Sequence, residues 1–185
     1  MKIVIASYLH GSAQAVRALD LRIKAESPDY IFLLGDLLYH GPRNSLPPDY
    51  DTMCCAEILN SYAEKIVCVR GNCDAEVDQW VLDFSIKDNV AYFVDEETGV
   101  NFVLSHGHRP GLIASEPLES MPEHCAFLSG HTHVKQLEMK AGVLLVNPGS
   151  TSIPKDGCAS YATYDAGRFA LKNLDGEVLK EFDYS

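Results

Sequence analysis

Along the first half of the chain, the spacing of the hydrophobic positions alternates between two periods. Short unbroken apolar runs, which are typical of buried strands, occur at residues 2–7, 29–36 and 66–72. Elsewhere the apolar residues recur every three or four positions, which predicts amphipathic helices at residues 13–26 and 51–65. In the first helix Val16, Leu19 and Ile23 form the apolar side, and Ser12 is placed to cap its N-terminus. This alternating order of strands and helices predicts three parallel strands.

The second half is rich in strands that short turns connect. We expect strand-containing segments at residues 90–95, 100–108, 125–133, 135–140, 142–150, 160–167, 168–176 and 177–184. The sequence has no internal repeat, low-complexity tract or linker. We therefore expect residues 1–185 to form a single α/β domain, with two packed mixed β-sheets flanked by helices.

Several of the predicted strands end beside a residue that can bind a metal ion. These residues are His10, Asp36, Asn72, His106, His108, His131 and His133. Because the carboxyl ends of parallel strands share one edge of a sheet, we expect these side chains to converge. Nitrogen and oxygen donors without a thiolate suit Mn, Fe, Zn, Ni or Co. The set is too large for one ion, and a carboxylate such as Asp36 is able to bridge two ions about 3.5–4 Å apart.

The composition limits the class of partner. The chain carries a formal net charge of −11, which argues against a nucleic-acid polymer or an anionic membrane as its main partner. No apolar run approaches the roughly 18 residues of a membrane span, and the start "MKIVIA" is too short in apolar residues for a signal peptide. The six cysteines form no Cys-x-x-Cys pair, which favours reduced thiols and a cytoplasmic location.

Four ordered motifs give the chain a resemblance to a known family. They are Gly35-Asp36, "GNCD" at 71–74, "SHGH" at 105–108 and "GHTH" at 130–133. With them the chain resembles the calcineurin-like metallophosphoesterases. Two further segments, "HGPRN" at 40–44 and "NPGSTSIPK" at 147–155, make it most similar to the YfcE-type phosphodiesterases. The resemblance implies an αββα sandwich and a phosphoric ester hydrolase with two divalent metal ions, often Mn.

The resemblance also implies which residues would bind the two ions. Asp36 would bridge them. His10 and His133 would bind one ion at what we call the first metal position. Asn72, His106 and His131 would bind the other ion at the second metal position.

In the same family pattern, a hydroxide that bridges the two metals attacks phosphorus in line. His108, and with it Arg43 and Asn44 from the loop after the second strand, would face the substrate phosphate. Cys73 stands where many relatives have a histidine that assists the leaving group. Asp74 or solvent would then supply that proton.

Tyr8 departs from the family pattern, which places a metal-binding carboxylate two residues before His10. If the strand end is extended, Tyr8 and His10 point the same way, toward the site. A phenol with a pKa of about 10 is uncharged at neutral pH, so the exchange removes one negative charge that would face the ions. Such a loss should cost at least about 10–100-fold in metal affinity. We expect the second metal position to survive and the first to be weak or vacant.

The function that follows is hydrolysis of a small or nucleotide-like phosphodiester, with activity reduced by Tyr8 and a homo-oligomer suggested by the YfcE-type resemblance. Two alternatives stay open. The retromer subunit Vps29 has this fold and serves as an interaction module, so a weakly active or inactive scaffold is one of them. Retention of the metal-binding residues argues against a scaffold, whereas Tyr8 argues for it. A phosphomonoesterase is the other, since it would differ only in the shape and charge of its pocket.

Overall fold

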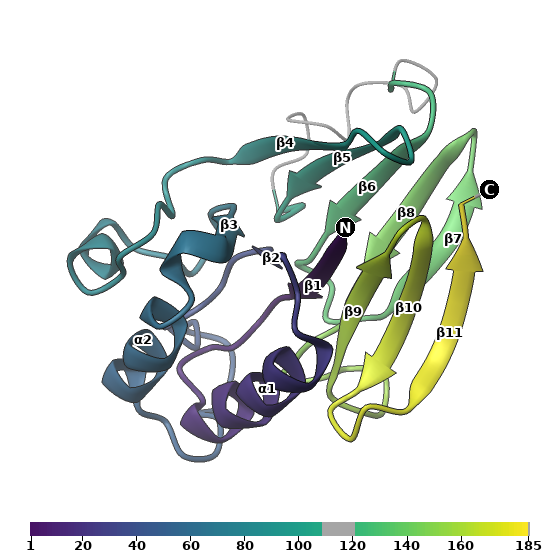
Figure 1. Ribbon diagram of the computed structural model, residues 1–185. Coiled ribbons are helices and arrows are strands. Elements are labelled where there is room, and N and C mark those ends of the chain that lie inside the picture. Colours follow the sequence, from purple (N-terminus) through teal and green to yellow (C-terminus); the bar gives the residue numbers. More distant parts are fainter. Residues whose placement is uncertain (109–120, 185) are drawn as a thin grey trace.

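The computed structural model describes residues 1–108 and 121–184, and its strands form two sheets (Figure 1). The first sheet has the order β11-β10-β9-β1-β2-β3, with β1 (Lys2–Ala6), β2 (Tyr30–Leu33), β3 (Ile66–Cys68), β9 (Ser160–Asp165), β10 (Arg168–Asn173) and β11 (Val178–Asp183). The second has the order β4-β5-β6-β8-β7, with β4 (Val90–Asp95), β5 (Val100–Ser105), β6 (Cys125–Ser129), β7 (Gln136–Lys140) and β8 (Val143–Asn147). The helices are α1 (Ala13–Glu26) and α2 (Thr52–Asn60), with short 3₁₀ turns at Ala63–Lys65 and Glu76–Trp80.

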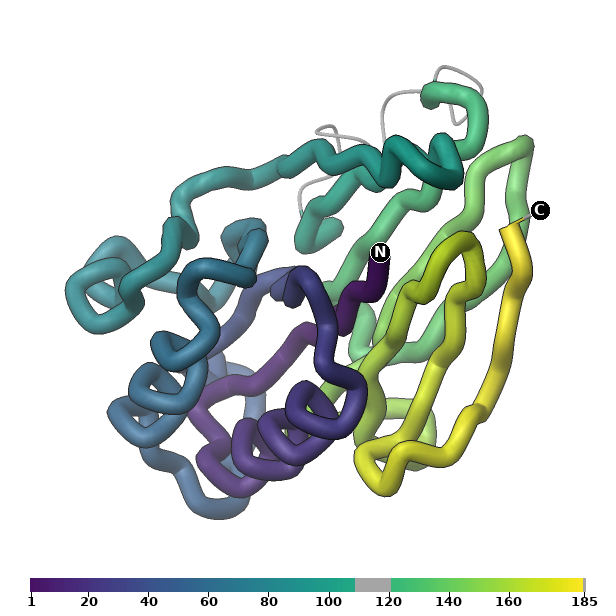
Figure 2. Tube along the Cα trace, viewed as in Figure 1, coloured from purple at the N-terminus to yellow at the C-terminus, as the bar shows by residue number. Residues whose placement is uncertain are grey.

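Each sheet contains a parallel core of strands whose carboxyl ends lie at one edge. β1, β2 and β3 are parallel to one another, and so are β5, β6 and β8. The other strands are antiparallel to their neighbours. A late part of the chain returns to the N-terminal strand: the yellow-green strand β9 pairs with the purple strand β1 (Figure 2). The expected α/β fold with two packed mixed sheets is confirmed.

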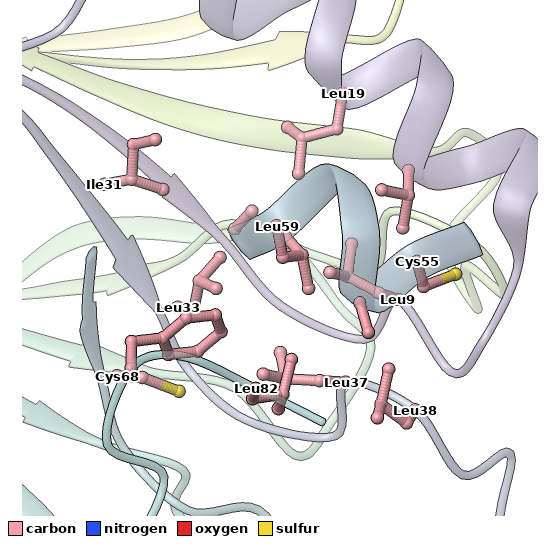
Figure 3. Packing of buried hydrophobic residues seen from close by; sticks show 14 of the residues in the cluster. Leu9, Leu19, Ile31, Leu33, Leu37, Leu38, Cys55, Leu59, Cys68 and Leu82 are labelled. Atoms are coloured by element: carbon pink, nitrogen blue, oxygen red, sulfur yellow. The ribbon is translucent and has the colours of Figure 1, made fainter. Parts of the chain in front are cut away.

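Alternation along β1 separates two hydrophobic cores. Ile3 and Ile5 pack in the core between the two sheets, whereas Val4 and Ala6 pack toward the helices. Figure 3 shows the helix-side core, in which these side chains gather: Leu19 from α1, Leu59 from α2, and Ile31 and Leu33 from β2. A fully buried Leu or Ile contributes about 1.5–3 kcal/mol, so the two cores give the loops at the strand ends a rigid base.

The first helix has the expected bounds, whereas the second is shorter than expected. α1 has the predicted bounds, and Oγ of Ser12 caps it by accepting the N–H of Ala15 at 3.3 Å. The prediction that the second helix continues to residue 65 is wrong, since α2 ends at Asn60. The reason is local: the Ser61 hydroxyl donates to the carbonyl of Ile58 at 2.6 Å, a bond that competes with continued helix.

Two further expectations concern the chain as a whole. Within the two described ranges, no helix is long and apolar enough to cross a membrane. All six cysteines lie in these ranges and are free thiols, in agreement with the expectation from their spacing.

Candidate metal centre

The loops that follow the parallel strands bring the predicted metal-binding residues to one edge of the two sheets. Ten non-glycine residues in the described part of the chain have positive φ, and half of them are site residues with φ between 48° and 63°: Tyr8, His10, Asp36, His131 and His133. A left-handed backbone conformation costs on the order of 1–3 kcal/mol per residue, and residues that adopt it are concentrated at functional sites. Tyr8 and His10 are thus not the extended pair that alternation predicts, because β1 ends at Ala6. The left-handed turn directs both of their rings inward.

Two glycines allow the loops after β2 and β3 to touch. A Cβ on Gly71 would lie 2.1 Å from Oδ1 of Asp36, and a Cβ on Gly35 would lie 2.4 Å from the backbone nitrogen of Gly71. Neither position has room for a side chain. The glycines that precede Asp36 and Asn72 therefore set these two side chains next to each other.

The segment after β8 ties the loop after β1 to the loop after β6. Ser152 donates both its backbone N–H, at 3.2 Å, and its hydroxyl, at 2.7 Å, to the carbonyl of Tyr8. Asn147 is buried and donates its amide hydrogen to the carbonyl of Gly130 at 2.8 Å. These bonds hold the two loops at a fixed separation.

The donor atoms of the second metal position converge on one point. Oδ1 of Asn72 lies 3.1 Å from Nε2 of His106 and 2.9 Å from Nδ1 of His131. Oδ2 of Asp36 lies 3.5 Å from the same Nε2 of His106. Ligands that are about 2.0–2.2 Å from one divalent ion lie roughly 3–3.5 Å from each other, so these four side chains fit such an ion.

Backbone carbonyls fix the orientation of three of the imidazoles. Nδ1 of His10 lies 2.7 Å from the carbonyl oxygen of Tyr39, Nδ1 of His106 lies 2.6 Å from that of Leu34, and Nδ1 of His133 lies 3.0 Å from that of Ile153. A carbonyl only accepts, so Nδ1 carries the hydrogen and Nε2 keeps the lone pair that a metal needs.

Burial keeps the site imidazoles neutral. It lowers the pKa of His10, His106 and His131, and it lowers the pKa of His133 to about 4. A neutral imidazole is the form that binds metal, so no proton has to leave these rings at neutral pH.

The first metal position does not fit an ion, because the ring of Tyr8 lies among the histidines around it. Tyr8 is 0% exposed, and its ring stacks on His133 with 3.8 Å between the centroids. The centroids of His10 and His106 are 5.4 and 5.3 Å from that of Tyr8. Its hydroxyl has no hydrogen-bond partner within the described ranges. An aromatic ring thus takes the volume in which the resemblance implied a carboxylate.

Asp74, expected as a proton donor, has a different place in the structure. Its carboxylate is buried and accepts three backbone N–H groups, from Asp36 and Leu37 at 2.8 Å each and from Gly71 at 2.7 Å. These bonds use the carboxylate to hold the loops after β2 and β3 together. The arrangement favours a positioning role for Asp74 over the donation that the sequence suggested. Burial, reinforced by the charge of Asp74, raises the pKa of the Asp36 carboxyl.

A cleft of about 380 Å³ opens over the second metal position. It is lined by Asp36, Gly41, Pro42, Arg43, Asn44, Asn72, Cys73, His131, His133 and Lys155. Arg43 and Asn44 thus line the same cleft as Asp36 and Asn72. The ring of His108 is 5.2 Å from that of His106 and 6.1 Å from that of His131, next to the same position. Lys155 was missed by the sequence reasoning, although it ends a segment that the motif comparison had singled out.

Comparison with known proteins identifies the family and the fold. Residues 1–168 match the profile of the calcineurin-like phosphoesterase superfamily domain. The chain is 41% identical over 181 residues to phosphodiesterase YfcE of Escherichia coli K12, covering 97% of this chain and 95% of that protein. A solved structure of YfcE, described as a phosphoesterase from E. coli, superposes with a TM-score of 0.92 at 34% identity over 100% of both chains.

More distant structures share the fold alone. A zinc complex of Vps29 from Entamoeba histolytica superposes with a TM-score of 0.64 at 16% identity, over 100% of both chains. The match to YfcE is much closer and extends over nearly the whole chain. The chain belongs to the calcineurin-like phosphoesterase superfamily, in which its close relative is a phosphodiesterase.

Proposed function

We propose that this chain is a metal-dependent phosphodiesterase that hydrolyses a small or nucleotide-like phosphodiester, and that Tyr8 impairs it at the first metal position. The observation that carries the proposal is the convergence of Asn72 Oδ1, His106 Nε2, His131 Nδ1 and Asp36 Oδ2. When bound, divalent ions supply positive charge for the phosphate oxygens and a water molecule acidic enough to act as a nucleophile near neutral pH. We propose Mn as the ion, with Fe, Zn, Ni and Co as the other candidates that such donors suit.

The residues around the cleft support an anionic substrate in spite of the net charge of −11. Arg43 and Lys155 both line the cleft, and each offers a cation to the phosphate or to a second acidic group of the substrate. His108 lies beside the second metal position, where it is placed to contact a phosphate oxygen. Asp74 acts here by orienting the backbone of Asp36.

Tyr8 supports a reduced activity. In place of a charged carboxylate it presents a buried ring stacked on His133, so the first metal position loses both a negative ligand and free volume. The same observation favours a second candidate function, a catalytically weak or inactive interaction module with the Vps29 fold. An inactive module would have no use for the pre-oriented imidazoles, so we place the enzyme first. A phosphomonoesterase stays a further alternative. Cytoplasmic location and a homo-oligomer stay predictions.

The test is hydrolysis of bis(p-nitrophenyl) phosphate across a Mn titration, with Tyr8→Asp beside the protein as it is. We expect the aspartate variant to reach half-saturation at a Mn concentration lower by at least about 10–100-fold and to turn over faster. Tyr8→Phe is the matched control, since it keeps the ring and removes a hydroxyl that has no partner within the described ranges. If Tyr8→Asp and Tyr8→Phe behave alike, the assignment of Tyr8 to the first metal position is wrong. If neither protein turns over at any Mn concentration, the interaction module replaces the enzyme as the preferred function.

A further inference from the structure

His10 keeps a donor atom that the first metal position no longer uses. The side chain is 0% exposed, and its Nδ1 is held by the carbonyl of Tyr39. Its Nε2 is buried and makes no hydrogen bond to any described residue, and Oδ2 of Asp36 lies 3.8 Å away. A buried imidazole nitrogen without a partner costs free energy unless something binds it. The nitrogen faces Asp36, which suggests a cation between the two.

Cys73 supplies a third donor on the same side of Asp36. Its backbone N–H donates to Oδ1 of Asp36 at 2.8 Å, which fixes the residue beside that carboxylate. Its thiol is half-buried and faces the cleft, with Nδ2 of Asn72 at 3.2 Å from Sγ. One donor atom from each of His10, Asp36 and Cys73 lies within 4.8 Å of the others. We call these three residues the thiol cluster.

We propose that the thiol cluster binds a second divalent ion of soft character, typically zinc, displaced from the first metal position, with Asp36 shared with the second metal position. The proposal depends on the proposed function at one point only, namely that Asp36 also binds the ion at the second metal position. It differs from the expectation of a site without thiolate, which rests on the residues at the strand ends.

Charge and geometry both support the displaced ion. A thiolate at Cys73 restores the negative charge that the family carries at the place of Tyr8, so two anionic ligands again face the ions. A tetrahedral ion with bonds of about 2.0–2.3 Å holds its ligand atoms about 3.3–3.8 Å apart, so the cluster has to close by no more than about 1–1.5 Å. Rotation of the half-buried Cys73 side chain is able to supply that movement. Three protein ligands leave the fourth position open to solvent or substrate, as in catalytic zinc sites.

Binding at the thiol cluster changes the protonation of one group. The thiol of Cys73 gives up its proton to solvent as the sulfur–metal bond forms, so one proton is released for each ion bound there. Thiolate favours zinc, cobalt and cadmium over manganese, so a metal mixture should fill the two positions with different ions.

The experiment uses the full chain, freed of metal and then loaded with Co²⁺ as a spectroscopic probe or with Zn²⁺ for counting. Ions per chain are measured by mass spectrometry of the metal after desalting, and the sulfur-to-cobalt charge-transfer band is read in the near ultraviolet. Cys73→Ser removes the proposed ligand atom at nearly constant volume. Cys54→Ser is the matched control, because that thiol lies on α2 and contacts Arg17.

We expect two ions per chain and a sulfur band in the unmodified protein and in Cys54→Ser. Cys73→Ser should lose the band and keep one ion. Tyr8→Asp should also lose the band but keep two ions, since a carboxylate at the family position draws the ion away from sulfur. A band that persists in Cys73→Ser overturns the proposal, and so does an unmodified protein that binds one ion without a band. Failure to bind any ion would instead refute the proposed function at the second metal position.

Discussion

Replacement of Asp74 by asparagine separates a positioning role from a chemical one. The carboxylate accepts N–H groups from Asp36 and Gly71 on Oδ2 and from Leu37 on Oδ1. If the new amide oxygen takes the place of Oδ2, two bonds remain but lose the charge of the acceptor, which costs about 0.5–1 kcal/mol each. The amide nitrogen then faces the N–H of Leu37, and one buried donor without a partner costs about 1–3 kcal/mol. The expected loss in the free energy of unfolding is about 3 kcal/mol.

Urea denaturation at neutral pH measures this loss, and it would be a large part of the roughly 5–15 kcal/mol that stabilises a typical domain. Asp78→Asn is a suitable control. Among the described residues, the Asp78 carboxylate accepts a single N–H, from Ala75 at 2.8 Å, so its change should cost no more than about 1 kcal/mol. The reasoning would be refuted if Asp74→Asn kept the stability of the unmodified protein but lost turnover. In that case the carboxyl group would take part in the reaction, as the sequence first suggested.

Three other outcomes are expected. Two lysines and a tyrosine bond to Glu26, the pKa of which falls to about 2 although burial alone would raise it. Its stabilisation, about 2 kcal/mol after allowance for solvent screening, is present above about pH 4.5 and is lost as the pH falls toward 2, so Glu26→Gln should flatten the acid limb of stability measured in urea. Gly71→Ala should unfold more easily by about 2 kcal/mol or more and bind Mn more weakly, since its Cβ would displace the carboxylate of Asp36; equal Mn affinity in calorimetry would contradict this. Lys155→Ala should raise KM for an aryl phosphodiester about 10-fold, whereas the exposed Lys180→Ala should leave it unchanged.

The convergence of the site was accessible from the sequence because it depends on two local regularities. Apolar runs fix the strands, and a polar residue after each run is carried to the edge where parallel strands end. Asp36, Asn72, His106 and His131 meet in the structure for that reason. The alternation rule failed at Tyr8, where the backbone leaves the extended region directly after β1.

The bonds that orient the site were not accessible from the sequence. The imidazole of His106 is held by the carbonyl of Leu34, which is 72 positions away, and a carbonyl leaves no mark in the identity of its residue. For a similar reason, the three N–H partners of the Asp74 carboxylate could not be predicted from its place next to the "GN" motif. The place of Lys155 in the cleft could have been predicted, since it is the cation that ends the motif at 147–155.

The bond between Ser152 and Tyr8 joins positions that are 144 residues apart. During synthesis the first three strands and both α-helices therefore emerge from the ribosome long before the loop that completes the centre, and a nascent chain has no formed site in which to trap the wrong ion. Contacts between residues so far apart in the sequence form slowly, so we expect this bond to form late in folding. The same bond makes release of a bound ion depend on β9, which follows Ser152 in the chain and lies between β10 and β1 in its sheet: local opening of β9 would loosen the loop around Tyr8. Metal exchange in the mature protein should then keep pace with amide hydrogen exchange in β9, at the seam between the beginning and the end of the chain.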